Sequence, residues 1–589
     1  MNLELRIMKN CRWVFLVFCV ECLSGLGYNG AEIGSEAQGR VMKNANTLRV
    51  EGMRSMEDRV QGRLDFGRVV VFGVVLVCAF SSASLGAPWL GSGDANDPYQ
   101  IWTAEDMQAI GADANYWDAY FVLCADINLG SYTGTSFNII GNDVNAFTGV
   151  FDGDGHTISN FTYDSNGVNY IGLFGAVGCW SEEKSGDIKD LVLVDPNVNA
   201  GSGGAIGSLV GRLVNGTISS CYIRGGGVSG YGGVGGLVGD NEGGEIADCY
   251  SQGEVSGVYR TVGGLVGWHS GTVWNSYAWG SVTGEYSVGG LVGMNKGMIS
   301  NCYATGKVEG DGAIGGLVGT NASATVWNCY ATASVEGEEA TGGLVGVNEC
   351  ETVSNCYATG SVTGGISTGG LVGMNKGGTI SKCYAAGSVV GTGPYAGGLV
   401  GYHYPGGSYM KSFWNSEIIN PYIPGIGNWN DPNVIGETTA NMQTESTFTD
   451  AGWDFVGEFI NGPNDIWDIC EGTNYPKLVW QIPAGDLVCP DGVDGIDVGV
   501  LCEEWLFEEL SCDVWPEGGD GFVDFLDWVI FADGWGHAYD IFDLAEFAGQ
   551  WLKSGSNYLV TDIAPGSDGD GITNGVDFAA MAENWLEGI

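Results

Sequence analysis

The stretch that decides the fold is Gly289–Val308, GGLVGMNKGMISNCYATGKV. Close copies follow one another along the middle of the chain, at steps of 26 to 28 residues. A period of this length indicates stacked supersecondary units, each of which covers the apolar face of its neighbour. The copies begin at Gly207, Gly235, Gly263, Gly289, Gly315, Gly342, Gly369 and Gly397.

Each copy contains only short apolar pieces separated by Gly, Asn and Ser, such as Leu291-Val292 and Cys302-Tyr303-Ala304. No piece is as long as a typical helix of about 11 residues, and glycine also disfavours a helix. Short apolar runs bounded by glycine are typical of strands. Antiparallel hairpins are one alternative, but units that all run in the same direction are buried more simply by stacking. The sequence therefore predicts a mainly β protein, a right-handed parallel β-helix of about nine to eleven coils.

The pattern GGLVGxN followed by GxIxNCYAxGxVxG resembles the GLUG-motif repeat of bacterial secreted and surface proteins. The resemblance covers about residues 207–401, and seven later copies keep GGLVG unchanged. It implies an extracellular setting. Some GLUG repeats accompany the catalytic domain of immunoglobulin A-cleaving metallopeptidases, where they are not the catalytic part, so the resemblance by itself implies no activity.

The remaining chain divides around this array. Residues 88–200 resemble the lead-in and first, divergent coils of such arrays, with a short helix expected from Thr103. The repeats themselves occupy 201–412, and 413–484 resemble a closing segment with a short helix around Thr439–Thr444. Four tryptophans are expected to seal the last coil: Trp414, Trp453, Trp467 and Trp480.

Residues 1–87 read as a presequence. The apolar run Val69–Phe80 follows several arginines and precedes small residues, which is the pattern of a cleaved signal peptide. It is shorter than the roughly 20 residues that a membrane-spanning helix needs, so no transmembrane anchor is expected in the mature chain. Translation is expected to start at Met53 or Met56. The protein is thus predicted to be secreted or displayed on the bacterial surface.

The charge is strongly unbalanced, since 22 basic residues face 70 acidic ones and the net charge is −48. A nucleic-acid partner is not expected, because phosphates need Lys and Arg. Anionic membranes are disfavoured for the same reason. The balance suits solubility, divalent cations and a saline environment.

Two columns of side chains recur once per coil. Cysteine occupies one, and its stacked, parallel side chains are expected to form a buried ladder of thiols rather than disulfides. A metal site there is not favoured, because the cysteines of this column form no CxxC and no His sits in register with them. Ile or Val lies three residues earlier, so a bend must fall between them, at Asn275, Asn301, Asn328 and Asn355. The cysteines are Cys221, Cys249, Cys302, Cys329, Cys356 and Cys383.

Tyrosine occupies the second column and is expected to face outward, since it follows the cysteine. Two readings stay open for this stripe. Tyrosines could stack on one another and stabilise the sheet. They could instead present an aromatic surface to sugar rings or a protein partner. The ligand-facing stripe would be Tyr250, Tyr277, Tyr303, Tyr330, Tyr357 and Tyr384.

Residues 485–589 form an acidic tail with four segments that pair an Asp-containing loop with an amphipathic, tryptophan-bearing helix pattern. This tail resembles dockerin type I modules, which implies calcium loops and a cohesin-like partner. Several first-position ligands of the calcium loop are missing, so an acidic helical domain without metal stays open. The candidate Ca²⁺ ligands are Asp491, Asp494, Asp497, Asp520, Asp524, Asp527, Asp540, Asp543, Asp568, Asp570, Asn574 and Asp577.

Catalytic chemistry is sparse. None of the four histidines belongs to HExxH, which excludes a zincin peptidase by motif, and none has a GxSxG nucleophile elbow beside it. His269 and His403 are interpreted as turn residues. The best catalytic cluster is Asp152, Asp154 and His156, although DGDG also suits a tight turn.

The sequence favours a non-catalytic structural or adhesive protein docked through its calcium-stabilised tail. The alternative is a polysaccharide-active lyase or glycoside hydrolase on a β-helix, because the fold permits an enzyme without indicating one.

Overall fold

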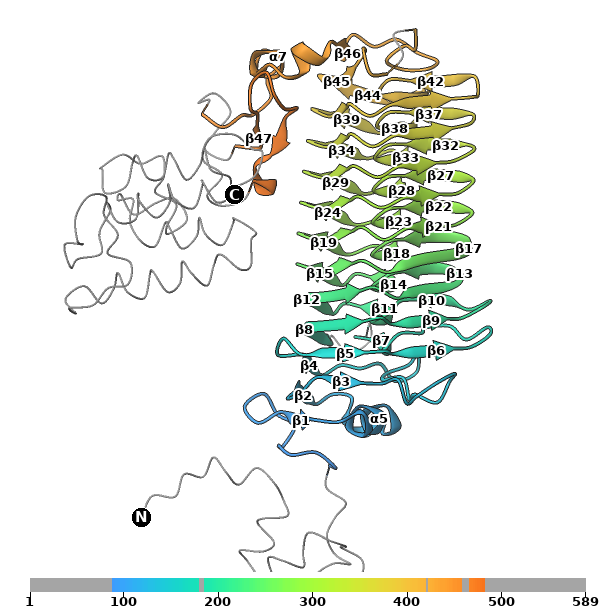
Figure 1. The fold of residues 1–589 in the computed structure, drawn as a ribbon, viewed down its shortest axis with the longest axis vertical. Helices are drawn as coiled ribbons and strands as arrows, with labels where there is room; N and C mark the ends of the chain where they lie inside the picture. Colours follow the sequence, from blue (N-terminus) through green and yellow to red (C-terminus); the bar gives the residue numbers. More distant parts are fainter. Residues whose placement is uncertain (1–86, 180–184, 420–421, 458–464, 483–589) are drawn as a thin grey trace, which may run out of the picture. The chain divides into compact units, whose positions relative to one another are not determined.

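The computed structural model describes residues 87–179, 185–419, 422–457 and 465–482. They form a mainly β protein, a parallel β-solenoid of about eleven turns (Figure 1). Each strand of the array pairs in parallel with its counterpart in the next coil; Ile299, for example, lies between Val273 and Val326. The predicted β-helix is confirmed. The predicted signal peptide and the tail, residues 485–589, lie outside the described residues.

Three sheets make the three faces of the helix. The first carries the LVG part of each repeat. Its nine strands are β7 (Phe174–Val177), β11 (Val210–Val214), β14 (Val238–Glu242), β18 (Val266–His269), β23 (Val292–Asn295), β28 (Val318–Ala322), β33 (Val345–Glu349), β38 (Val372–Lys376) and β43 (Val400–Tyr404).

The second sheet carries the stretch before each GG pair. Its fifteen strands are β6 (Thr162–Asp164), β9 (Asn197–Asn199), β10 (Gly204–Ile206), β13 (Gly227–Gly235), β17 (Glu254–Gly263), β21 (Val282–Thr283), β22 (Tyr286–Gly289), β26 (Val308–Glu309), β27 (Gly312–Gly315), β31 (Val335–Glu336), β32 (Ala340–Gly342), β36 (Val362–Gly364), β37 (Ser367–Gly369), β41 (Val389–Gly391) and β42 (Tyr395–Gly397).

The third sheet carries the Ile/Val, Cys and Tyr positions. Its 22 strands are β1 (Tyr99–Ile101), β2 (Tyr120–Leu123), β3 (Ile127–Asn128), β4 (Val150–Asp152), β5 (Thr157–Ser159), β8 (Asp187–Val194), β12 (Thr217–Arg224), β15 (Glu245–Ala247), β16 (Tyr250–Ser251), β19 (Thr272–Trp274), β20 (Tyr277–Ala278), β24 (Met298–Ser300), β25 (Tyr303–Ala304), β29 (Thr325–Trp327), β30 (Tyr330–Ala331), β34 (Thr352–Ser354), β35 (Tyr357–Ala358), β39 (Thr379–Ser381), β40 (Tyr384–Ala385), β44 (Ser408–Met410), β45 (Ser412–Asn415) and β46 (Val434–Glu437).

The predicted bend between the Ile/Val and Cys positions is confirmed, and it results from a left-handed backbone conformation. Asn275, Asn301, Asn328 and Asn355 all adopt φ between 48° and 53°. Asparagine tolerates this left-handed region better than most residues. The bend turns Ile299 and Cys302 to the same interior, and both are fully buried. The predicted inward cysteine ladder is confirmed, and all six of its thiols are free.

The constant GG pair has a packing reason. A Cβ atom on Gly290 would lie 2.1 Å from the carbonyl oxygen of Gly316 in the next coil. Any side chain there would therefore push adjacent coils apart. This explains why the repeat keeps glycine at this position.

A column of polar side chains runs through the interior of the first sheet, at the N of GGLVGxN. Asn295, Asn321, Asn348 and Asn375 are fully buried. Each donates its side-chain amide to the next, at 2.9, 2.8 and 3.2 Å along the stack. We call this column the asparagine ladder. It satisfies polar groups that would otherwise be costly to bury.

Short elements close both ends of the stack. The first coil is covered by α5 (Ala104–Ala112), which begins at Thr103 in a capping box with Asp106 and buries Met107 and Ile110. The helix expected from Thr103 is thus confirmed. A 3₁₀ turn, η2 (Ala114–Tyr116), follows it.

The last described segment holds the remaining elements. They are α6 (Thr439–Met442), α7 (Glu445–Thr449), the antiparallel pair β47 (Trp467–Asp468) and β48 (Lys477–Leu478), and η3 (Val479–Gln481).

Candidate functional sites: the aromatic ladder and the corner pocket

The tyrosine column forms a continuous stack on the outside of the third sheet. We call it the aromatic ladder. Successive rings have centroids 4.6–5.1 Å apart and planes within 18° of each other. The ladder consists of Tyr222, Tyr250, Tyr277, Tyr303, Tyr330, Tyr357 and Tyr384.

This stacking changes what the ladder can bind. A sugar ring packs on the face of an aromatic ring, but inside the stack each face is covered by a neighbouring tyrosine. The ladder therefore presents ring edges and hydroxyl groups along most of its length. Such a surface suits hydrogen bonding and edge contacts better than stacking on sugar.

The end of the ladder nearest the chain's C-terminal side is covered by the chain itself. Tyr357 and Tyr384 are buried in one cluster with Trp453 and Trp467. The hydroxyl of Tyr384 donates to the carbonyl oxygen of Pro476 at 2.7 Å. Trp453 and Trp467 were expected to seal the last coil, and they are fully buried, but they pack beside the ladder.

Trp480 extends this cover by two more coils. Its indole N–H donates to the carbonyl oxygen of Asn328 at 3.0 Å, and its ring lies 5.8 Å from Tyr330 and 6.3 Å from Tyr303. Burial raises the pKa of Tyr330 to about 12. The uncovered part of the ladder is therefore Tyr222 to Tyr277, joined by Trp279, which stacks at 5.1 Å on Tyr250 and Tyr277.

The catalytic candidates of the DGDG stretch hold a turn together. Asp152 accepts the backbone N–H of Asp154 at 2.9 Å and pairs with Lys189 at 2.7 Å. Asp154 sits at φ 48°. His156 Nδ1 lies 3.2 Å from an Asp126 carboxyl oxygen. These contacts account for the three side chains as parts of a turn, and their catalytic role stays a prediction.

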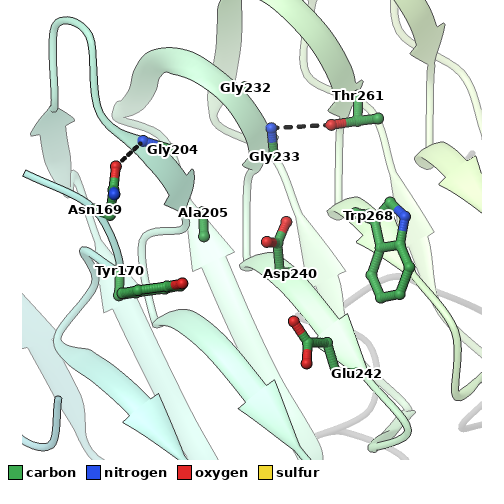
Figure 2. A pocket seen from close by; sticks show the side chains of 10 residues that line it. All are labelled: Asn169, Tyr170, Gly204, Ala205, Gly232, Gly233, Asp240, Glu242, Thr261 and Trp268. Carbon is green, nitrogen blue, oxygen red and sulfur yellow. Dashed lines mark hydrogen bonds between the residues drawn. The ribbon is translucent and has the colours of Figure 1, made fainter. Parts of the chain in front are cut away.

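A pocket lies in the corner between the first and second sheets, over the early coils. Its volume is about 400 Å³. Figure 2 shows Tyr170 on one side, Trp268 on the other, and the carboxyl groups of Asp240 and Glu242 between them. We call it the corner pocket. It is lined by Asn169, Tyr170, Gly204, Ala205, Gly232, Gly233, Asp240, Glu242, Thr261 and Trp268.

The corner of this coil differs from the corner of later coils. In a later coil the same corner is closed by a hydrogen bond between Ser287 Oγ and Thr320 Oγ1, at 2.8 Å. Here the corner residue is Gly233, at φ 61°, and a Cβ atom on it would lie 2.4 Å from a carboxyl oxygen of Asp240. Glycine thus leaves the space that Asp240 occupies.

Charge in the pocket is partly compensated. Arg212 donates to both carboxyl oxygens of Glu242, at 3.0 and 2.6 Å, and pairs with Asp143 at 3.0 Å. Among the residues that the structure describes, Asp240 has no hydrogen bond or ion pair within bonding distance. Burial, followed by the charge of Glu242, raises the pKa of Asp240 to about 7, although Arg212 opposes this.

Sequence reasoning missed this pocket. Its signal was present at the x position of GGLVGxN, which is Asp240 and then Trp268 in adjacent copies, whereas later copies carry Met294, Thr320 and Val347. The register places Asp240 directly beside Trp268.

His269 and His403 were interpreted as turn residues, and this is wrong. Both lie in strands, His269 at the end of β18 and His403 in β43. His269 is fully buried and takes an asparagine's place in the asparagine ladder, with Nδ1 3.1 Å from the Asn241 amide nitrogen. Burial lowers its pKa to about 4.

The proposed calcium ligands, Asp491 to Asp577, lie outside the described residues. Within the described ranges, no three His, Cys, Asp or Glu side chains are arranged to hold a metal ion. Within the same ranges, no helix is both long and apolar enough to cross a bilayer.

The comparison with protein families identifies the repeats. The model of the GLUG motif matches residues 230–256, 284–309 and 337–363. These copies are therefore GLUG motif repeats, as the sequence pattern predicted.

Two curated relatives match part of the chain. Halomucin of Haloquadratum walsbyi is 36% identical over 144 residues, 23% of this chain and 2% of its own length. A proposed Gly-rich membrane protein of Evansella cellulosilytica is 36% identical over 128 residues, 21% of this chain and 14% of its own length. The chain thus spans only a small part of either relative.

A solved structure shows a low level of similarity. It is a proposed immunoglobulin A1 protease of Bacteroides ovatus, with a TM-score of 0.34 and 25% identity, covering 42% of this chain and 79% of that one.

Proposed function

We propose that the protein is a non-catalytic structural or adhesive β-helix, secreted or displayed on the bacterial surface. The observation that carries this is the parallel pairing of the three sheets from coil to coil, together with the buried asparagine ladder along the first sheet. Such a stack resists bending, because each coil is paired with the next on three faces. A stiff element of this kind suits a spacer that holds a binding surface away from the cell.

Independent features support a location outside the cell or on its surface. The curated relatives include a protein named for a membrane, and a net charge of −48 keeps a surface protein soluble. Cys470 is disulfide-bonded, which is typical of proteins outside the reducing cytosol.

Anchoring is assigned to the acidic tail, residues 485–589. We propose that its dockerin-like loops bind Ca²⁺ and that the folded tail docks to a cohesin-like surface partner. Calorimetry of the full chain with Ca²⁺ and then with a chelator tests this. A transition that chelator removes, while the β-helix transition stays in place, supports the calcium-stabilised tail. Identical traces contradict it.

A polysaccharide-active enzyme is the second candidate, and one observation favours it. Asp240 and Glu242 are two residues apart on one face of β14 and line the same pocket. Glycosidases use such a pair, one carboxyl protonated and the other ionised.

Two measurements on the purified full chain decide between these functions. Co-sedimentation with insoluble polysaccharides reports adhesion, and release of reducing ends reports cleavage. Adhesion without release supports the structural and adhesive function. Release that disappears in Glu242→Gln, or in Asp152→Ala, makes the protein an enzyme and names the site.

A further inference from the structure

We propose that the corner pocket binds one neutral sugar residue of a glycan, held between Trp268 and Tyr170 with its hydroxyl groups on Asp240. This inference rests on the adhesive part of the proposed function and names its ligand class. The volume of about 400 Å³ lies within the usual range of small-molecule sites, roughly 300–1,000 Å³.

The walls fit the apolar side of a sugar. Trp268 and Tyr170 lie on opposite sides of the pocket (Figure 2). Neither belongs to the aromatic ladder. Arg212 lies over the Tyr170 ring, 5.5 Å from its centre, and Lys296 lies 5.8 Å from the centre of the Trp268 ring, so a sugar would pack on the other face of each ring. The C–H face of a pyranose packs on such rings.

The floor fits its hydroxyl groups. Asp240 is a carboxyl group with no hydrogen-bond partner among the described residues, which makes it available to accept from sugar hydroxyls. Asp240 is half-buried, and a polar group that is withdrawn from water normally has a partner, which a ligand would supply here. Thr261 Oγ1 is already engaged, because it accepts the N–H of Gly233 at 2.9 Å and donates to the Arg260 carbonyl at 2.8 Å.

Charge selects a neutral ligand. An anionic sugar would be repelled by the carboxyl groups of Asp240 and Glu242. A cationic sugar would be repelled by Arg212 and Lys296. Arg212 already pairs with Glu242 and Asp143, and the ammonium of Lys296 lies 5.8 Å from the Trp268 ring centre. A neutral polyol both donates and accepts hydrogen bonds, and it disturbs neither ion pair.

Titration calorimetry and ligand-observed NMR on the full chain test this, with methyl glycosides of neutral hexoses, an N-acetylhexosamine and a uronic acid as probes. We expect at least one neutral glycoside to bind. Asp240→Ala and Trp268→Ala should each weaken it tenfold or more, about 1.4 kcal/mol. Asp311→Asn and Trp327→Ala, two exposed residues away from the pocket, are the matched controls and should leave binding unchanged.

Three outcomes would overturn the proposal. One is that no neutral glycoside binds, or that only the uronic acid does. Another is binding that survives both pocket variants when circular dichroism shows them folded. The third is glycoside cleavage that requires Glu242. If the pocket variants still co-sediment with polysaccharide, the sugar site is wrong while the adhesive function stands.

Discussion

At the scale of single residues, a histidine in the asparagine ladder makes the stability of the fold depend on pH. His269 replaces asparagine between Asn241 and Asn295. Its Nδ1 accepts from the Asn241 amide and its Nε2 donates to the Met298 carbonyl oxygen at 3.3 Å, which requires the neutral ring. An imidazolium could not accept from Asn241 and would be buried as an uncompensated charge.

We therefore expect His269→Asn to improve acid stability. Burial lowers the pKa of His269 from 6.5 to about 4, so the unfolded chain takes up a proton before the folded chain does. The contribution of neutral His269 to the free energy of unfolding is fully present above about pH 6.5. It is lost as the pH drops toward 4, by at most about 3 kcal/mol. The variant should match the wild type near pH 8 and melt at higher temperature near pH 5.

His403→Asn is the matched control, since His403 is only partly buried. Its ring stacks on the Trp429 ring near the last coil, with centroids 5.3 Å apart. Its effect on acid stability should be smaller. Equal melting curves for His269→Asn and wild type at both pH values would contradict the pKa assignment.

At the scale of elements, the aromatic ladder acts as the docking surface for the chain's own C-terminal segment. Trp453, Trp467 and Trp480 contact tyrosines of four coils that lie far from them in sequence. The third sheet would otherwise expose a long row of tyrosines. Cover from this segment turns Tyr357 and Tyr384 into core residues.

Tyr384→Ala should therefore loosen the C-terminal segment. The variant removes a buried ring and its bond to Pro476, and such truncations cost about 3–5 kcal/mol. Hydrogen exchange should rise over residues 439–457 and 465–482 and stay low in β23 and β28 at the centre of the stack. The matched variant Tyr222→Ala, at the uncovered end, should cost only about 1 kcal/mol. Equal exchange in both variants would mean that the segment is held by other contacts.

At the scale of the whole β-helix, stability is the sum of similar coils and their interfaces. Equivalent positions recur every 26 to 28 residues, and each coil meets its neighbours through the same columns. If one complete coil is removed, the coils on either side of it can pair through the same columns. The corner pocket and the aromatic ladder depend on this register, because each collects residues from several coils.

Deletion of one complete coil, Gly289–Ile314, should give a folded, shorter β-helix, because Gly315 then takes the place of Gly289 in every column. Circular dichroism and small-angle scattering should show retained β structure and a reduced length. Deletion of half a coil, Gly289–Asn301, shifts inward residues outward and should unfold the array. Unfolding by both deletions would show that the coils are not interchangeable.

The sequence by itself determined the β-helix, the inward cysteines and the bends at Asn275, Asn301, Asn328 and Asn355. These features follow from local periodicity, since the spacing of apolar residues and of residues that tolerate positive φ is written within each copy. The outward direction of the tyrosines followed from the same alternation.

Only the tertiary structure decided how those columns are used. The cover over Tyr330 comes from Trp480, which bonds to a carbonyl 152 positions away, and no local pattern encodes that distance. The corner pocket likewise needs Gly233, Asp240 and Trp268 from adjacent coils to meet at one corner. Contacts between distant segments depend on packing geometry, because side chains that are equivalent in sequence become buried or exposed according to what lies over them.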